Sequence, residues 1–257
     1  TGAGSGIGRA LAEELAKQGA RLALADVAEK PLAETVANLP AGTDAKIYRL
    51  DVSSREAVFE FADNVVRDFG TAHFVVNNAG ISTLATVEHV SIEEIERVLA
   101  VNLWGVVYGT KAFLPIFLKQ KEGCIVNVSS VFGLLATPCS VAYTMSKFAV
   151  RGLTETLWQE LDGTGVRGVL VHPGGIKTNI PKNTFEAKFA GDFERRMSES
   201  NIRQMITPPN DCAREIVAGL IRGDKRLLVG NGAKALHRIS RLMPDNYDKL
   251  LRKKLNY

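Results

Sequence analysis

The stretch that most constrains the fold of this chain covers residues 125–150 and reads IVNVSSVFGLLATPCSVAYTMSKFAV. The apolar run at 124–128 ends on Ser129 and Ser130, as a buried parallel strand does when it delivers polar groups to the carboxyl edge of a sheet. Residues 143–161 carry apolar side chains at helical spacing, so we expect a helix there. A buried strand followed by such a helix predicts an α/β fold.

Tyr143 and Lys147 lie four residues apart in this helix and therefore share one face. An ammonium close to a phenol stabilises the phenolate and lowers the phenol pKa from its usual value of about 10. Tyr143 would then act as a general acid or base, and Ser130 would hydrogen-bond the oxygen of a carbonyl substrate. Taken alone, a Tyr and a Lys at this spacing are more often a packed ring and a solvated side chain, so other segments must decide.

The chain opens with TGAGSGIG at residues 1–8, which fits the pattern TGxxxGxG and not GxGxxG. Glycines allow a tight turn and a close approach of the backbone to a pyrophosphate. The helix that begins near Ile7 points its first N–H groups at the anion. We therefore expect Gly2, Ser5, Gly6 and Ile7 to bind a dinucleotide cofactor.

The predicted strand at 21–25 ends on Asp26, twenty residues after Gly6. A carboxylate at this place accepts hydrogen bonds from the adenosine ribose hydroxyls and repels a 2′-phosphate. Ser5 is neither Arg nor Lys, so the sequence favours NAD over NADP; the alternative is that Asp26 is an exposed loop residue. Because the glycine-rich turn should leave a central strand, we also expect a strand before Thr1.

Two further strands are predicted at 46–52 and 74–76. The first ends at Asp51 and Val52, where Asp51 would accept a hydrogen bond from the adenine amino group or face the next helix N-terminus. The second leads into NNAG at 77–80, whose small residues would let the backbone pass beneath a cofactor. The cofactor contacts predicted here are Asp51, Val52, Asn78, Ala79 and Gly80.

Two helix starts carry the spacing of a capping box, Ser53 with Glu56 and Ser91 with Glu94. The second of these helices leads into VNLWGVV, an apolar run that contains Asn102. A buried asparagine usually binds a neighbouring backbone group.

A strand predicted at 166–171 ends at HPGGIKT. Pro173, Gly174, Ile176 and Thr178 would hold a nicotinamide carboxamide through backbone groups and the threonine hydroxyl. Residues 179–210 depart from the alternation of strands and helices. They carry an apolar stripe every four residues that would close over an apolar substrate as a lid or pack on the body of the protein: Phe185, Phe189, Phe193 and Met197. A helix at 211–222 and a last strand at 226–229 follow.

The composition fits one domain of 1–257 with an ordinary core, since 46% of the 257 residues are hydrophobic. Its three cysteines form no ligand cluster, which argues against a disulfide framework and a metal site. We see no apolar run of membrane-spanning length and expect a cytoplasmic protein. The segment 223–257 has nine Lys or Arg against three Asp or Glu. Contact of its amphipathic helices with an anionic membrane or another subunit is less expected than a solvated face with an apolar seam against the body.

The motifs TGAGSGIG, NNAG, Asn102, Ser130, YTMSK and PGGIKT, in this order and spacing, resemble the short-chain dehydrogenase/reductase family over almost the whole chain. The resemblance implies a single-domain doubly wound parallel sheet, Rossmann-like, flanked by helices on both faces. It implies that Tyr143 is the catalytic acid/base and that Lys147 lowers its pKa and holds the nicotinamide ribose. It further implies that Ser130 positions the substrate oxygen and that Asn102 supports Lys147 through a water.

The implied activity is hydride transfer between a nicotinamide cofactor and a small-molecule secondary alcohol or ketone. Apolar residues near the motifs hint at an apolar substrate: Leu84, Val87, Phe132, Leu134 and Leu135. The alternative is a non-catalytic dinucleotide-binding sensor or scaffold of the same fold. Nucleic-acid binding by the basic tail lacks aromatic platforms and is disfavoured. Family members are commonly homotetramers or homodimers joined through helices that correspond to 100–119 and 143–161.

Overall fold

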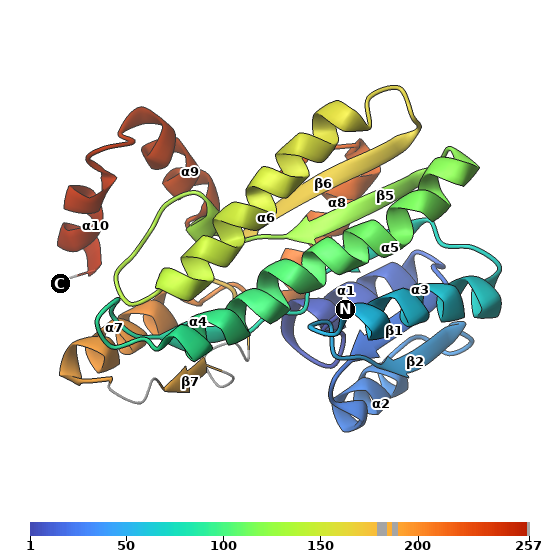
Figure 1. The fold of residues 1–257 in the computed structure, drawn as a ribbon, viewed down its shortest axis with the longest axis horizontal. Coiled ribbons are helices and arrows are strands. Elements are labelled where there is room, and N and C mark those ends of the chain that lie inside the picture. The colour runs from blue at the N-terminus through green and yellow to red at the C-terminus, as the bar shows by residue number, and fades with distance from the viewer. Residues whose placement is uncertain (179–183, 187–189, 256–257) are drawn as a thin grey trace.

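The computed structural model describes the backbone of residues 1–178, 184–186 and 190–255 (Figure 1). Four parallel strands form the centre of the sheet in the order β3, β5, β6 and β8. Their bounds are Phe74–Asn77 for β3, Gly123–Val128 for β5, Val166–Pro173 for β6 and Arg226–Val229 for β8. A second parallel pair joins β1 (Leu22–Asp26) to β2 (Ala45–Arg49). These strands confirm the predicted parallel α/β sheet.

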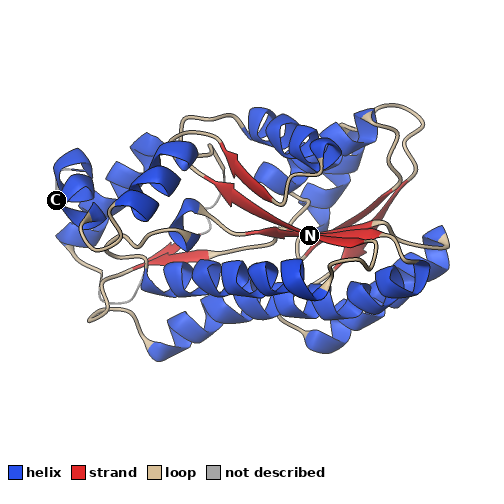
Figure 2. Ribbon diagram, turned by 90° about the horizontal axis from the view of Figure 1, so that it is seen from above, coloured by secondary structure: helices blue, strands red, loops and turns tan. Residues whose placement is uncertain are grey.

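Helices cover both faces of the sheet, as Figure 2 shows from above. One face packs on α1 (Gly6–Lys17) and α8 (Pro209–Arg222), and the other on α3 (Arg55–Phe69), α5 (Gly105–Gln120) and α6 (Val141–Glu160). Neighbouring residues of β5 point to opposite faces, so Ile125 packs with the second group and Val126 with the first. This double cover confirms the expected Rossmann-like arrangement and explains why β5 is largely apolar, with Asn127 as its polar residue.

The start of the chain lies between β1 and β3. The amino group of Thr1 donates a 2.9 Å hydrogen bond to the carbonyl oxygen of Val76, and the Ala3 N–H donates one of 3.0 Å to Ala25. A cavity of about 580 Å³ lies beside it, lined by residues that include Leu22, Leu24, Val75 and Phe113.

The two predicted capping boxes have different outcomes. Ser91 and Glu94 form one at the start of α4 (Ile92–Leu99), where the Glu94 N–H donates to Ser91 Oγ at 3.2 Å and the Ser91 N–H to Glu94 at 2.8 Å. The box of Ser53 with Glu56 is wrong. The Asp51 carboxylate accepts both the N–H and the hydroxyl of Ser53, so the helix begins one residue later. Ser54 caps it by accepting from the Ala57 N–H.

The helix α4 continues through the π-helical turn η1 (Ala100–Trp104) into α5. The whole segment Ile92–Gln120 is long and apolar enough to cross a membrane by length and composition, contrary to our reading of the sequence. Its side chains Phe113 and Phe117 are buried in the core against the sheet. Packing of this helix on β3 and β5 accounts for its apolar character.

The helix α2 (Glu29–Ala37) packs beside β1, β2 and α1. Several short elements surround the carboxyl edge of the sheet. They are β4 (Ser82–Leu84), η2 (Val131–Gly133), β7 (Thr184–Glu186), α7 (Asp192–Gln204), α9 (Ala233–Leu242) and α10 (Tyr247–Leu255). The strand β7 pairs in parallel with β4, and α8 and β8 confirm the helix and strand predicted at 211–222 and 226–229. The three cysteines are buried free thiols.

The predicted apolar stripe of the lid is only partly described. Met197 on α7 is 1% exposed and Phe193 is half-buried. Phe189 and the side chain of Phe185 lie outside the described residues, so the two readings of the stripe stay open. In the C-terminal segment Leu251 is buried while Leu242 is 81% exposed, and the Tyr247 hydroxyl accepts a hydrogen bond from the Ala136 N–H.

Candidate active site

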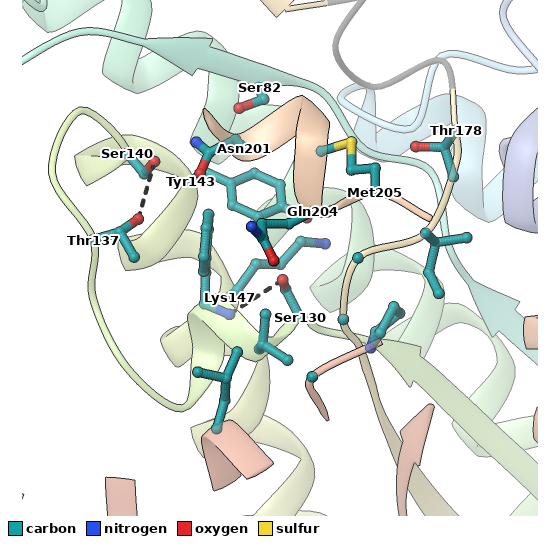
Figure 3. Close-up of a pocket in the computed structure, with 18 of the residues that line it drawn as sticks. Ser82, Ser130, Thr137, Ser140, Tyr143, Lys147, Thr178, Asn201, Gln204 and Met205 are labelled. Atoms are coloured by element: carbon teal, nitrogen blue, oxygen red, sulfur yellow. Dashed lines mark hydrogen bonds between the residues drawn. The ribbon is translucent and has the colours of Figure 1, made fainter. Parts of the chain in front are cut away.

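A pocket of about 210 Å³ lies at the carboxyl end of β5 and β6 (Figure 3). Its walls come from segments far apart in the chain, which the parallel sheet brings to one edge. The predicted site residues that line it are Ile7, Asn78, Gly80, Ser130, Tyr143, Lys147, Pro173, Gly174, Ile176 and Thr178. The pocket therefore joins the glycine-rich turn to the Tyr143 end of α6.

Ser130 lies two residues after the end of β5 and caps the turn η2. Its hydroxyl oxygen accepts the Phe132 N–H at 3.1 Å, while its carbonyl oxygen accepts the Gly133 N–H at 2.9 Å. The ring nitrogen Nδ1 of His172 lies 2.8 Å from the same carbonyl. Three hydrogen bonds thus hold Ser130 at the pocket wall, and its hydroxyl also hydrogen-bonds the side chain of Tyr143.

Tyr143 and Lys147 project from one face of α6 toward Ser130. The Lys147 ammonium nitrogen Nζ lies 5.5 Å from the centre of the Tyr143 ring and donates a 2.9 Å hydrogen bond to the carbonyl oxygen of Val128. The ring of Phe132 packs edge-on against Tyr143, with 6.0 Å between the ring centres. Two residues that the sequence linked only by spacing therefore meet in one buried place.

The electrostatics of this pair differ from our expectation. Burial lowers the pKa of Lys147 to about 8. Burial also raises the pKa of Tyr143, and the hydrogen bond with Ser130 acts in the opposite direction. The predicted lowering of the Tyr143 pKa by Lys147 is thus not the net direction in this structure. The physical reason is desolvation of the phenol.

Asn102 sits in the π-helical turn η1 and is fully buried. Its side-chain oxygen accepts the Ile81 N–H and its side-chain nitrogen donates to the Ile81 carbonyl, both at 2.9 Å. The same nitrogen lies 3.3 Å from Ser146 Oγ, which in turn donates to the Tyr143 carbonyl at 2.7 Å. Asn102 therefore ties the segment after β3 to α6, and the water-mediated role toward Lys147 stays a prediction.

Small residues let α6 approach the end of β5, a feature that our reading of the sequence missed. Ser129 Oγ donates a 2.8 Å hydrogen bond to the Lys147 carbonyl. A Cβ at Gly133 would lie 2.3 Å from Ser129 Oγ and 2.6 Å from the Lys147 carbonyl oxygen. The only signal for this contact in the sequence is the pairing of a second serine with a nearby glycine.

The glycine-rich turn has no room for side chains. A Cβ at Gly8 would lie 2.1 Å from the Gly2 carbonyl oxygen, and one at Gly6, where φ is +55°, would lie 3.3 Å from Cβ of Thr178. The helix α1 begins at Gly6 and Ser5 makes no side-chain capping bond, so the first N–H groups of the helix face this turn. The turn, the helix start and the adjoining pocket fit a dinucleotide with its pyrophosphate at Gly6.

Thr1 anchors the turn to the NNAG segment. Its hydroxyl oxygen accepts the N–H groups of Asn78 and Ala79, both at 3.0 Å, and its carbonyl accepts from the Asn78 side chain at 2.8 Å. A Cβ at Gly2 would lie 2.9 Å from Cα of Ala79. The two segments predicted to bind the cofactor are therefore packed against each other.

Asp26 lies at the end of β1 beside the turn. One carboxylate oxygen accepts the Gly4 N–H at 2.9 Å and the other accepts the Ala28 N–H at 3.0 Å. Asp51 uses one oxygen to accept from Ser53, and Val52 packs against Gly105, where a Cβ would lie 2.9 Å from it. Asp26 thus has a structural role in the turn besides the predicted role toward ribose.

The helix α7 contributes pocket residues that the sequence did not reveal. Figure 3 shows the carboxamides of Asn201 and Gln204 among the side chains around Tyr143, with Met205 beside them. The pocket is closed further by Leu236 of α9 and Leu251 of α10. The positions of these helices depend on long-range packing, so no local pattern marks their residues.

Glu194 holds α7 against the loop after β4. Its buried carboxylate lies 2.6 Å from Nδ1 of His89 and accepts from the hydroxyl of Thr86 at 3.1 Å and from the Gly191 N–H at 3.0 Å. Burial raises the pKa of Glu194, but the hydrogen bonds from His89 and from backbone N–H groups outweigh this effect and lower the pKa to about 2. The carboxylate is therefore ionised and fixes one wall of the pocket.

Comparison with known proteins identifies the family. Residues 1–188 match the family model described as short chain dehydrogenase. An oxidoreductase of Mycobacterium tuberculosis named SadH is 46% identical over 260 residues, which are 98% of this chain and 92% of that protein.

Two solved structures share the fold. A short chain dehydrogenase/reductase from Burkholderia phymatum in complex with NAD has a TM-score of 0.87 and 34% identity, over 94% of this chain and 91% of that one. An alcohol dehydrogenase from Thermococcus sibiricus complexed with 5-hydroxy-NADP has a TM-score of 0.74 and 29% identity, over 88% and 91%. With the site geometry and these matches together, the chain belongs to the short-chain dehydrogenase/reductase family of oxidoreductases.

Proposed function

We propose that this oxidoreductase transfers a hydride between a nicotinamide dinucleotide, with NAD preferred, and an apolar secondary alcohol or the corresponding ketone. The observation that carries the proposal is the placement of Ser130, Tyr143 and Lys147 in one pocket that continues to the glycine-rich turn. Proton transfer to or from a substrate oxygen suits a largely apolar pocket that holds a phenol, a hydroxyl and an ammonium.

In this account the chain supplies orientation and a proton path. Tyr143 takes the proton of the substrate hydroxyl during oxidation and returns it during reduction, at its phenolic oxygen. Ser130 hydrogen-bonds the same substrate oxygen, and the Lys147 charge stabilises the phenolate. When bound, the nicotinamide supplies the hydride acceptor or donor. The residues that would hold it are Pro173, Gly174, Ile176 and Thr178, with Lys147 at its ribose.

The preference for NAD rests on Asp26. Its carboxylate stands at the end of β1 beside the turn, where it would accept hydrogen bonds from ribose and repel a 2′-phosphate. The solved relatives include one with NAD and one with an NADP derivative, so cofactor choice within this fold depends on such local residues. The charge of Asp26 favours the form without the phosphate.

The rest of the pocket wall supports the proposed apolar substrate class. Apolar side chains surround the space next to Tyr143 and Ser130: Leu84, Phe132, Leu135, Ile202, Met205, Leu236 and Leu251. Burial of apolar substrate surface against them contributes about 25 cal/mol for each Å² removed from water. Polar alcohols of similar size would lose hydration against these apolar side chains.

The test is a spectroscopic assay of NADH formation with NAD⁺ and a panel of 2-nonanol, 1-phenylethanol, estradiol and glycerol. We expect turnover of at least one of the three apolar alcohols and none of glycerol. Binding of NADH without turnover of any panel member, or of its ketone in the reverse direction, would instead support a non-catalytic dinucleotide-binding protein.

We also propose that the chain forms a homodimer or homotetramer through the helices η1–α5 and α6. Large apolar side chains are exposed on these helices, among them Trp104 at 50%, Met145 at 47% and Phe148 at 39%. Trp104→Glu combined with Phe148→Glu should lower the molar mass measured by light scattering to that of a smaller assembly. An unchanged mass would place the interface elsewhere.

The free, buried thiols favour a reducing compartment, and we propose the cytoplasm.

A further inference from the structure

Behind Ser130, on the side away from the pocket, a buried chain of hydrogen bonds leads from β6 to β8. His172 of β6 is fully buried, and its Nδ1 lies 2.8 Å from the Ser130 carbonyl oxygen. Its other ring nitrogen, Nε2, lies 3.2 Å from the Arg226 guanidinium. We propose that His172, oriented by Arg226, is a positioning residue that fixes the Ser130 backbone and so aims the Ser130 hydroxyl at the substrate oxygen. The proposal rests on the function proposed above.

The two partners determine the protonation of the ring. A carbonyl oxygen only accepts, so Nδ1 of His172 must carry the proton that it donates to Ser130. A guanidinium only donates, so Nε2 of His172 must be the acceptor for Arg226. The ring is therefore neutral, with a single tautomer selected from both sides.

The charges around the ring favour the same state. Burial lowers the pKa of His172 to about 4, and the cations Arg226 and Arg151 add to this, while the bond with the Ser130 carbonyl opposes it. His237 of α9 also faces the ring and acts in the lowering direction. The acidic group in contact with these cations is Glu155. His172 thus remains a neutral donor throughout the ordinary pH range.

Arg226 is itself held by several contacts. Its guanidinium lies 2.5 Å from Glu155 Oε1, and the Cζ atom of Arg226 lies 5.1 Å from the centre of the Trp158 ring. Glu155 also accepts from Nε of Arg151 at 2.7 Å. Glu155 and Trp158 belong to α6, the helix that carries Tyr143 and Lys147. These contacts therefore fix the position of Ser130 relative to α6, the helix that carries the other two catalytic groups.

The orientation of the Ser130 carbonyl determines where the Ser130 hydroxyl is held. Ser130 is in an extended conformation, with φ −166° and ψ 169°, and the turn η2 starts immediately after it. Rotation of the peptide plane between Ser130 and Val131 would alter the place of the Phe132 N–H that holds Ser130 Oγ. A shift of about 1 Å in a catalytic group can lower a rate by about 100-fold.

Substitutions of His172 can separate this role from simple packing. Asn at this position can place its side-chain nitrogen near the place of Nδ1 and keep the donor to Ser130. Leu keeps much of the apolar volume but removes both the donor and the acceptor. The Leu variant also leaves a buried carbonyl with one partner fewer, so its folding must be checked by circular dichroism. His73→Leu, at an exposed histidine before β3, is the matched control.

The experiment measures kcat and KM with NAD⁺ and the panel alcohol that the wild type oxidises fastest. For His172→Leu we expect kcat to fall about 10- to 100-fold, while the Kd for NADH changes less than about twofold. The pH profile of kcat/KM is a second readout. It should shift to higher pH in His172→Leu, because the hydrogen bond with a well-placed Ser130 lowers the Tyr143 pKa. His172→Asn should stay within about threefold of the wild type in kcat, and His73→Leu should match the wild type.

A double-mutant cycle gives the decisive outcome. In a Ser130→Ala background, His172→Leu should cause no further loss of kcat, because its effect acts through Ser130. Multiplicative losses in the double mutant, an unchanged kcat in folded His172→Leu, or equal losses in the Asn and Leu variants would overturn the proposal. If His172→Leu fails to fold, Arg226→Gln with the same cycle replaces it, with an expected loss of about three- to tenfold. A wild type that turns over no panel member contradicts the proposed function itself, which the NADH binding measurement distinguishes from failure of the positioning role.

Discussion

Lys147 and Tyr143 share a buried site in which the ammonium nitrogen lies 5.5 Å from the centre of the phenol ring. Burial disfavours the charged form of both groups, since it lowers the pKa of Lys147 to about 8 and raises that of Tyr143. A charge that is costly to bury and lies beside a phenol in a pocket supports the catalytic role that we propose for the pair. This relationship leads directly to a stability–activity prediction.

Lys147→Met should lower kcat by at least about 100-fold without lowering the free energy of unfolding at pH 7. The folded-state pKa of about 8 is below the usual 10.5, so the unfolded state binds more protons between these values. Wild-type stability therefore rises with pH across this window, and any advantage of the Met variant should shrink there. Urea unfolding at pH 7 and pH 10 measures this; a clear loss of stability in the variant at pH 7 would show that Lys147 is structurally stabilising.

Asp26→Ala should reduce the NAD/NADP ratio of kcat/KM by about 10- to 100-fold, because a repulsive charge opposite the 2′-phosphate is removed. The variant also loses the acceptor for the Gly4 N–H, so both cofactors should bind somewhat more weakly. Taking the ratio cancels that common loss. Asp44→Ala, at an exposed aspartate paired with Arg21, is the control. An unaltered ratio would mean that Asp26 serves the turn alone.

Gly8→Ala should abolish measurable NADH binding and destabilise the fold by about 3 kcal/mol or more. The new Cβ would lie 2.1 Å from the Gly2 backbone oxygen, and neither atom is on a flexible side chain. Gly152→Ala on α6 is the matched control, since a Cβ there meets nothing within 4 Å. The control should gain about 0.5–1 kcal/mol from helix propensity. Normal cofactor affinity in Gly8→Ala would refute the tight turn as the binding element.

Glu194→Gln should destabilise the protein by about 1–3 kcal/mol at pH 7 and raise KM for the alcohol, because α7 lines the pocket. The folded-state pKa of Glu194, about 2, is below its usual 4.5. Its contribution is therefore complete above pH 4.5 and is lost as the pH falls toward 2. Thermal unfolding from pH 7 to pH 3 should show the Tm of Glu194→Gln converge with that of the wild type. The Tm of the control Glu199→Gln, at an exposed position, should keep a constant difference from the wild type. A constant difference would assign the effect to something other than this carboxylate.

Local patterns in the sequence predicted much of the site. The apolar run of β5 ending at Ser130 and the helical spacing of Tyr143 and Lys147 need only short-range information, and the structure places all three in one pocket. The sheet and its double cover of helices follow from the same alternation. Ser53 shows the limit of such patterns, because a carboxylate two residues earlier captures it and shifts the helix start.

Properties set by long-range packing could not be predicted in this way. His172 carries no motif, and its contact with Ser130 depends on β6 lying beside β5. Asn201 and Gln204 line the pocket from α7, a helix that Glu194 holds against the distant loop after β4. The direction of the Tyr143 pKa shift likewise depends on burial, which spacing does not encode.

Tyr143→Phe tests the central claim most directly, because it removes one oxygen atom and keeps the ring that packs on Phe132. We expect NAD-linked alcohol oxidation to fall by about 10²- to 10⁴-fold, while the Kd for NADH, measured by fluorescence, stays within about twofold. Oxidation within tenfold of the wild-type rate, with the same cofactor affinity, would contradict it.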